Sequence, residues 1–181
     1  MRLLEVMTAL RVWLLGTVLL AGLVYGQEAR LKPWEEAALN AVKAINAGNA
    51  DLFVAWAHPA ELYRLKEKLM RRVLTPVPDA PSIAEQLKPY GVRTLEELAR
   101  MPDAAFAAIA IPQQYLANDE VTREAMARAT FQIVRTVLVE EDVYEVHIAL
   151  HVPFEVQPLD QTLVALSVKD EAGKWKYSGL R

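Results

Sequence analysis

The chain has 181 residues, of which 53% are hydrophobic, and it contains no cysteine. The length predicts one ordinary domain, and the absence of cysteine excludes disulfides, thiolate nucleophiles, Cys-ligated zinc, Fe–S clusters and thioether-linked lipids. The formal net charge of −3 provides no sequence-wide attraction to nucleic acid or to an anionic membrane, so no nucleic-acid partner is expected.

The first 26 residues have the three-part form of an export signal. Arg2 and Arg11 precede an uncharged apolar run over residues 12–25. This run fits the apolar region of a signal peptide and is shorter than the roughly 20 residues that a membrane-spanning helix needs. Cleavage would make the mature chain begin at Gln27, whereas an uncleaved segment would be an N-terminal membrane anchor. Both interpretations predict an exported protein, periplasmic or secreted.

The part of the chain that follows is predicted to be helical. Apolar residues recur at helical spacing after Pro33, and this helix should end at Gly48. Further patterns predict helices over residues 50–57 and 59–73. Three prolines make residues 75–81 a loop.

Short helices should follow this loop. Ser82 and Thr94 are each followed three residues later by glutamate, which predicts two capping boxes. Further helical turns are expected after Asp103 and after Pro112, with a break at Pro112. Residues 75–118 thus form a predicted helical insertion.

Period-two patterns rich in β-branched and aromatic residues predict four strands near the C-terminus. They cover residues 129–140, 143–152, 162–169 and 174–180. Short polar breaks join the first strand to the second and the third to the fourth, so both pairs should form hairpins. The predicted fold class is α+β, with N-terminal helices packed on a C-terminal four-stranded antiparallel sheet in a single domain over residues 27–181.

Burial of one sheet face predicts the register of the first hairpin, because a slip by one residue would move polar side chains onto the apolar face. The expected pairs are Val139–Tyr144, Val137–Val146 and Ile133–Leu150. In the last hairpin, one apolar face is expected to hold Val164, Leu166, Val168, Trp175 and Tyr177.

Two turn sequences carry a resemblance to a known family. Residues 47–51 (Ala-Gly-Asn-Ala-Asp) lie between the first two helices, and residues 170–176 (Asp-Glu-Ala-Gly-Lys-Trp-Lys) lie in the last hairpin. Over residues 34–181 this arrangement resembles the nuclear transport factor 2-like (cystatin-like α+β) superfamily. The resemblance implies a strongly curved sheet wrapped around helices as a cone, whose open end often holds a ligand or an active site. Because the superfamily includes isomerases, dehydratases, transport adaptors and proteins of no known activity, it supplies no reaction.

Two histidines of the second strand are candidates for chemistry. His147 and His151 lie on its polar face with Glu145, but their Cα atoms should be roughly 13 Å apart, so a shared metal ion is not expected. One histidine with Glu145 could form a general acid–base pair, and a solvated sheet face is the alternative. His58 precedes Pro59 at a helix junction, where a hydrogen bond that closes the turn competes with a catalytic role.

Arg135 is the one charge on the face predicted to be apolar. It must pair with an acid, extend to solvent or line a cavity, where its guanidinium could bind a carboxylate ligand through two hydrogen bonds. Tyr144 and Trp175, on the same predicted face, are the aromatic ligand-binding candidates. A basic stripe on the third helix (Arg64, Lys68, Arg71 and Arg72) is either a solvated face or a contact for anionic lipid or an acidic partner.

The sequence contains no P-loop, dinucleotide-binding glycine pattern, His-Glu-x-x-His helix or Gly-x-Ser-x-Gly elbow, so no cofactor is expected. The leading hypothesis is an exported, non-catalytic domain that binds a small apolar or carboxylate-bearing ligand, or a protein partner, through a cone-like cavity or a sheet face. The first alternative is a cofactor-independent isomerase- or dehydratase-like acid–base enzyme that uses His147 or His58 with Glu145 or Asp119. The second is a membrane-tethered assembly module that associates through residues 1–26 with the membrane and through its exposed sheet face as a homodimer.

Overall fold

A computed structural model describes residues 30–75, 78 and 80–181. The chain divides after Lys32, and the fold is that of residues 33–181. The predicted signal peptide or anchor at residues 1–26 lies outside the described residues. In the described part of the chain, every helix is too short or too polar to cross a membrane.

Three helices begin where the sequence predicts: α2 (Pro33–Asn46), α3 (Ala50–Trp56) and α4 (Pro59–Leu74). Proline starts α2 and α4, at a position where its missing N–H breaks no helical hydrogen bond. Gly48, just after α2, has a φ of 63°, a left-handed conformation that cannot continue the helix. The Asn49 side chain then caps α3 by accepting a hydrogen bond from the amide of Leu52 at 3.0 Å.

The predicted capping boxes at Ser82 and Thr94 are confirmed. They start α5 (Ile83–Leu87), which continues into the 3-10 helix η1 (Lys88–Tyr90), and α6 (Leu95–Arg100). In the first box Glu85 accepts hydrogen bonds from the hydroxyl and the amide of Ser82, and these lower the pKa of the Glu85 carboxyl.

The helix α7 (Asp103–Leu116) runs through Pro112, so the predicted break there is wrong. Ala110 and Ile111, which precede this proline, are buried in two different apolar cores. The burial of apolar side chains on two sides of α7 stabilises the helix by more than the loss of one helical hydrogen bond destabilises it. The last helix, α8 (Glu120–Ala127), leads into the sheet.

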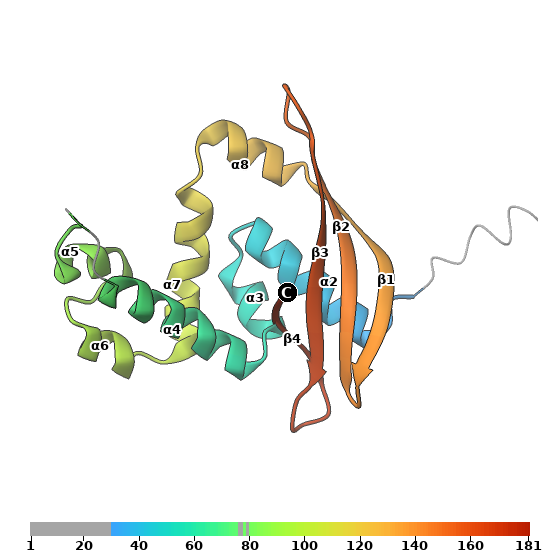
Figure 1. The fold of residues 1–181 in the computed structure, drawn as a ribbon, viewed down its shortest axis with the longest axis horizontal. Helices are drawn as coiled ribbons and strands as arrows, with labels where there is room; N and C mark the ends of the chain where they lie inside the picture. The colour runs from blue at the N-terminus through green and yellow to red at the C-terminus, as the bar shows by residue number, and fades with distance from the viewer. Residues whose placement is uncertain (1–29, 76–77, 79) are drawn as a thin grey trace, which may run out of the picture. The chain divides into compact units, whose positions relative to one another are not determined.

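The four strands form one antiparallel sheet in chain order, β1 (Thr130–Glu140), β2 (Val143–Val152), β3 (Leu159–Lys169) and β4 (Trp175–Leu180). The predicted α+β fold class, with helices before a four-stranded antiparallel sheet, is confirmed. Figure 1 shows α2 crossing behind the strands, while no helix of the described residues crosses in front of them. We call the face against α2 the inner face and the opposite face the outer face.

The first hairpin keeps the predicted register only at its tip, where Glu140 pairs with Val143. Further along, Thr136 and not Val137 pairs with Val146, so the predicted register is wrong. Two irregularities in β1 cause this difference, one between Leu138 and Glu140 and one between Ile133 and Arg135. Each adds a residue to β1 and shifts the pairing by one position.

These bulges change the face on which Arg135 lies. Ile133 pairs with the buried Ile148 on the inner face, whereas Arg135 pairs with His147 on the outer face. The prediction that Arg135 interrupts the apolar face is therefore wrong. It assumed strict alternation along β1, which a bulge at position 134 breaks.

The last hairpin is also shifted by one residue. Lys169 pairs with Trp175 and Ser167 with Tyr177, so the turn includes Lys174 as well as residues 170–173. Trp175 and Tyr177 consequently lie on the inner face. Val164, Leu166 and Val168 lie on the outer face, and the prediction that all five share one face is wrong.

The apolar side chains form two cores. The first joins α2, α3, α4 and α7 to the inner face of the sheet and includes Val42, Phe53, Val146 and Ile148. The second lies within the helical segment from α4 to α7, where Leu69, Val73, Leu87, Leu98 and Phe106 pack together. Figure 1 shows this helical segment on the side of α3 away from the sheet.

A buried lysine connects two parts of the helical segment. The Lys66 side chain of α4 is only 9% exposed and forms an ion pair with Asp103, the first residue of α7. Its ammonium group also donates to the carbonyls of Met101, at 2.8 Å, and Ala99, at 3.3 Å. These bonds fix the chain between α6 and α7 against α4.

We expect Lys66→Met to lower the free energy of unfolding by about 2–4 kcal/mol, because two carbonyls and a partly buried carboxylate lose their donor. Urea denaturation measures this change. Lys68→Met is the matched control, since Lys68 is exposed on the same helix. A difference between the two variants smaller than about 0.5 kcal/mol would show that this ion pair does not support the helical segment.

Candidate functional site

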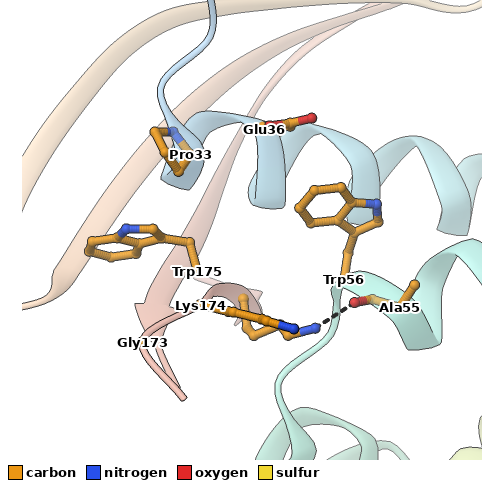
Figure 2. A pocket seen from close by; sticks show the side chains of 8 residues that line it. Pro33, Glu36, Ala55, Trp56, Gly173, Lys174 and Trp175 are labelled. Atoms are coloured by element: carbon orange, nitrogen blue, oxygen red, sulfur yellow. Dashed lines mark hydrogen bonds between the residues drawn. The ribbon is translucent and has the colours of Figure 1, made fainter. Parts of the chain in front are cut away.

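An open groove lies where α2, α3 and the β3–β4 hairpin meet (Figure 2). Its volume is about 630 Å³, and it is lined by Pro33, Glu36, Ala55, Trp56, Gly173, Lys174, Trp175 and Lys176. We call it the tryptophan groove, because Trp56 from the end of α3 and Trp175 from the start of β4 both line it. Most of its exposed lining is apolar, with two lysines and one glutamate as its charged groups.

Trp175 is held in place by other aromatic rings on the inner face. Trp34 stacks on Tyr144 with ring centres 4.2 Å apart and planes 5° apart. The Trp175 ring packs edge-on against Trp34 at 5.5 Å and against Tyr144 at 5.4 Å. Lys169 also places its ammonium group 5.8 Å from the Trp175 ring centre. Trp175 therefore enters the groove in a fixed orientation.

The lysines of the groove are positioned by the hairpin turn. Asp170 accepts hydrogen bonds from the amides of Ala172 and Lys174, at 3.0 and 2.8 Å, which closes the turn. Lys176 donates to the carbonyl of Ala55 at 2.6 Å and so connects β4 to α3. Among the described residues Lys174 has no hydrogen-bond or ion-pair partner for its ammonium group, which is thus available to a ligand.

A second polar group lies on the outer face of the sheet. It contains Arg135, Glu145, His147 and Arg181, and we call it the outer-face cluster. The side chains of His147 and Glu145 are only 13% and 15% exposed. His147 Nε2 lies 3.2 Å from Nη2 of Arg135 and 3.7 Å from Oε2 of Glu145, and the guanidinium of Arg181 pairs with the other oxygen of Glu145.

This geometry determines the proton position on His147. A guanidinium donates hydrogen bonds and never accepts them, so Nε2 of neutral His147 must accept from Arg135. The single proton of the neutral ring is then on Nδ1. With its Nε2 occupied by Arg135 and its distance to Glu145 beyond hydrogen-bond range, His147 is not arranged as the base of an acid–base pair.

The second candidate histidine of the sheet, His151, lies further along the outer face. His151 Nδ1 is 2.7 Å from Oδ1 of Asp160, and both residues border an open pocket of about 370 Å³. No group of three or more potential metal ligands occurs in the described part of the chain.

His58 and Asp119 are helix caps. The Nδ1 atom of His58 accepts a hydrogen bond from the amide of Ala60 at 3.2 Å, at the start of α4. Asp119 accepts from the amide and the hydroxyl of Thr122, which lowers the pKa of the Asp119 carboxyl. Neither residue lies in the tryptophan groove or in the outer-face cluster.

Ion pairs neutralise part of the predicted basic stripe on α4. Arg64 pairs with Glu61 at 2.9 Å, and Arg71 pairs with Glu67 at 2.8 Å. Burial raises the pKa of the Glu61 carboxyl, and the charge of Arg64 partly opposes this effect. Burial also raises the pKa of the Tyr177 hydroxyl, with a smaller contribution from Glu61.

The structure thus divides the predicted site residues between two faces. Arg135, Glu145 and His147 come together on the outer face, while Tyr144 and Trp175 lie on the inner face. Trp56, Lys176 and Arg181 were not among the sequence candidates. A tryptophan at the exposed end of a helix is the one signal that could have identified Trp56, because its partners come from distant segments.

The fold and both sites define the chain as an α+β domain with a tryptophan-lined groove at the edge of its sheet. No protein-family model matches the sequence, and the comparisons with curated proteins and with solved structures find no match.

The hydrogen bonds predict the tautomers of all three histidines. Neutral His58 should carry its proton on Nε2, because its Nδ1 accepts from an amide, whereas His147 and His151 should carry theirs on Nδ1. Long-range ¹H–¹⁵N spectra of the imidazole rings distinguish these forms, with single His→Gln variants for assignment. A proton on Nε2 of neutral His147 would contradict the described contact with Arg135.

Proposed function

We propose that the protein is a non-catalytic binding domain that takes a small ligand with an apolar ring and an acidic group in the tryptophan groove. The observation that carries this proposal is the pair Trp56 and Trp175, which come from distant segments and line one open groove. Tryptophan rings offer a large apolar contact area at a low cost in conformational entropy.

The charges of the groove support an acidic ligand. Lys174 and Lys176 contribute two positive charges, and Glu36 contributes one negative charge. Lys176 already donates to Ala55, so Lys174 is the residue that would bind the acidic group. Trp175, fixed by Trp34 and Tyr144, would bind the ring without further ordering, which favours affinity.

The acid–base enzyme is less well supported by the same geometry. Glu145 is paired with Arg181, and its other oxygen lies 3.7 Å from His147 Nε2, which accepts from Arg135. The alternative candidates His58 and Asp119 are engaged as helix caps. A proton transfer at any of these residues would first require one of these contacts to break.

Membership of the nuclear transport factor 2-like superfamily remains part of the proposal. Helices followed by an antiparallel sheet in chain order, with turns at residues 47–49 and 170–174, support it. In this structure Trp34 stacks on Tyr144, one of the aromatic residues that the sequence offers as a ligand-binding candidate. The proposed ligand therefore binds beside this aromatic stack and not beneath the sheet.

A ligand titration tests the groove. We expect phenylacetate to shift the indole Nε1 signals of Trp56 and Trp175 in ¹H–¹⁵N spectra, and to bind more tightly than its neutral analogue phenylacetamide. Trp56→Ala should weaken binding of both compounds about ten-fold, because an aromatic wall is lost. Lys174→Ala should remove the preference for phenylacetate and leave the affinity for phenylacetamide unchanged.

Lys43→Ala is the matched control for charge, since Lys43 is an exposed lysine in the last turn of α2 away from the groove. If wild type and Trp56→Ala bind phenylacetate with equal affinity, the tryptophan groove is not the binding site. An equal loss of affinity for Lys43→Ala and Lys174→Ala would show that only the net charge of the domain matters.

We also propose that the domain acts outside the cytoplasm, on the basis of the apolar run at residues 12–25. After expression of the full chain in an exporting bacterial host, intact-mass spectrometry of the non-cytoplasmic fraction should give a chain that begins at Gln27. A full-length chain in the membrane fraction would support the anchored assembly module instead. Recovery of the full-length chain from the cytoplasm alone would contradict both forms of export.

A further inference from the structure

The outer-face cluster has more positive than negative charge on its side chains. Arg135 and Arg181 contribute two positive charges and Glu145 contributes one negative charge. Arg181 pairs with Glu145, but the described partner of the Arg135 guanidinium is the His147 ring, which is uncharged when it accepts from Arg135. Arg135 is exposed, and among the described residues only its Nη2 has a hydrogen-bond partner, so its other N–H donors are available to a ligand.

Protonation of His147 must change this arrangement. The protonated ring carries a hydrogen on Nε2, which can no longer accept from Arg135 and instead faces a cation. The nearest acceptor for this hydrogen is Oε2 of Glu145, at 3.7 Å. The ring would move toward Glu145 and release Arg135.

The surroundings of His147 contain few competing groups. Arg135 faces it from β1, Glu145 lies two residues away on β2, and Val164 is its partner on β3. Arg181 approaches from the end of β4 through its bond from the backbone amide to the Val164 carbonyl at 2.9 Å. Among the described residues, the charged groups near His147 are thus Arg135 and Glu145. Arg181 affects His147 only indirectly, because it pairs with Glu145.

We propose that the outer-face cluster is a proton-gated site for a tetrahedral oxyanion, a sulfate or phosphate group carried by a small molecule. In the neutral state Arg135 is held by His147, and Glu145 occupies Arg181. On protonation His147 takes Oε2 of Glu145 as its partner and releases Arg135, while Arg181 keeps its pair with Oε1. The Arg135 guanidinium and the N–H groups of the exposed Arg181 that do not bind Glu145 can then donate to the oxyanion. Several donors from different directions match the oxygens of a tetrahedral anion better than those of a planar carboxylate.

The site is separate from the tryptophan groove. The groove is bordered by inner-face residues and by α2 and α3, whereas the cluster is on the uncovered outer face (Figure 1). Its proposed ligand is recognised by charge alone, and no aromatic ring of the groove takes part. The two sites can therefore be tested independently.

The test is a titration with sodium sulfate at constant ionic strength, at about pH 5.5 and about pH 7.5, which lie on either side of the range in which histidine commonly titrates. Sulfate keeps its double charge at both pH values, so a change in affinity comes from the protein. We expect binding about five-fold tighter at the lower pH, as one added charge near the anion predicts. Shifts of the Arg135 and His147 side-chain NMR signals would locate the sulfate.

Two variants separate the anion site from its gate. Arg135→Gln should lose sulfate binding at both pH values, and His147→Gln should bind with the same affinity at both. His151→Gln is the matched control, because His151 lies on the same strand and face but binds Asp160, and it should behave as wild type. Unchanged amide spectra would confirm that each variant is folded.

The proposal fails if wild type binds sulfate equally at both pH values, or if Arg135→Gln binds sulfate as wild type does. It also fails if His147→Gln keeps the full pH dependence, or if His151→Gln loses it. Loss of sulfate binding in Trp56→Ala would show that the two sites are not independent and would likewise overturn it.

Discussion

The packing of α2 against the inner face of the sheet is the interaction on which the rest of the domain depends. Trp34, in its first turn, stacks on Tyr144, and its backbone carbonyl accepts a hydrogen bond from the buried Ser167 hydroxyl at 2.7 Å. Val42, further along α2, belongs to the core that includes Val146 of β2. This single helix therefore defines which face of the sheet is buried and which face remains open to solvent.

Both candidate sites follow from that choice of faces. On the inner face, the aromatic side chains at the start of α2 hold Trp175, and this ring forms one wall of the tryptophan groove. On the outer face, no described helix covers the strands, and the half-buried Glu145 and His147 have Arg181 and Arg135 as their polar partners. A polar cluster is stable there because its charged ends reach water.

The helical segment from α4 to α7 has a different physical basis. Its core is separate from the one beneath the sheet, and Lys66 joins its elements through buried polar contacts. The sequence predicted helices in this segment from capping boxes, which are local signals. It did not predict that α7 would continue through Pro112, because burial of Ala110 and Ile111 depends on two separate cores.

The sequence by itself determined the α+β class, the two capping boxes and the four strands, because apolar spacing and capping and turn residues act over a few positions of the chain. The tertiary structure decided which residues meet. Bulges in β1 placed Arg135 beside His147, and a longer turn placed Trp175 on the inner face, because strand register depends on pairing with a neighbour and a shift of one residue exchanges the faces. Trp56 joins Trp175 only after α3 has packed beside the hairpin, so the groove exists in the folded chain alone.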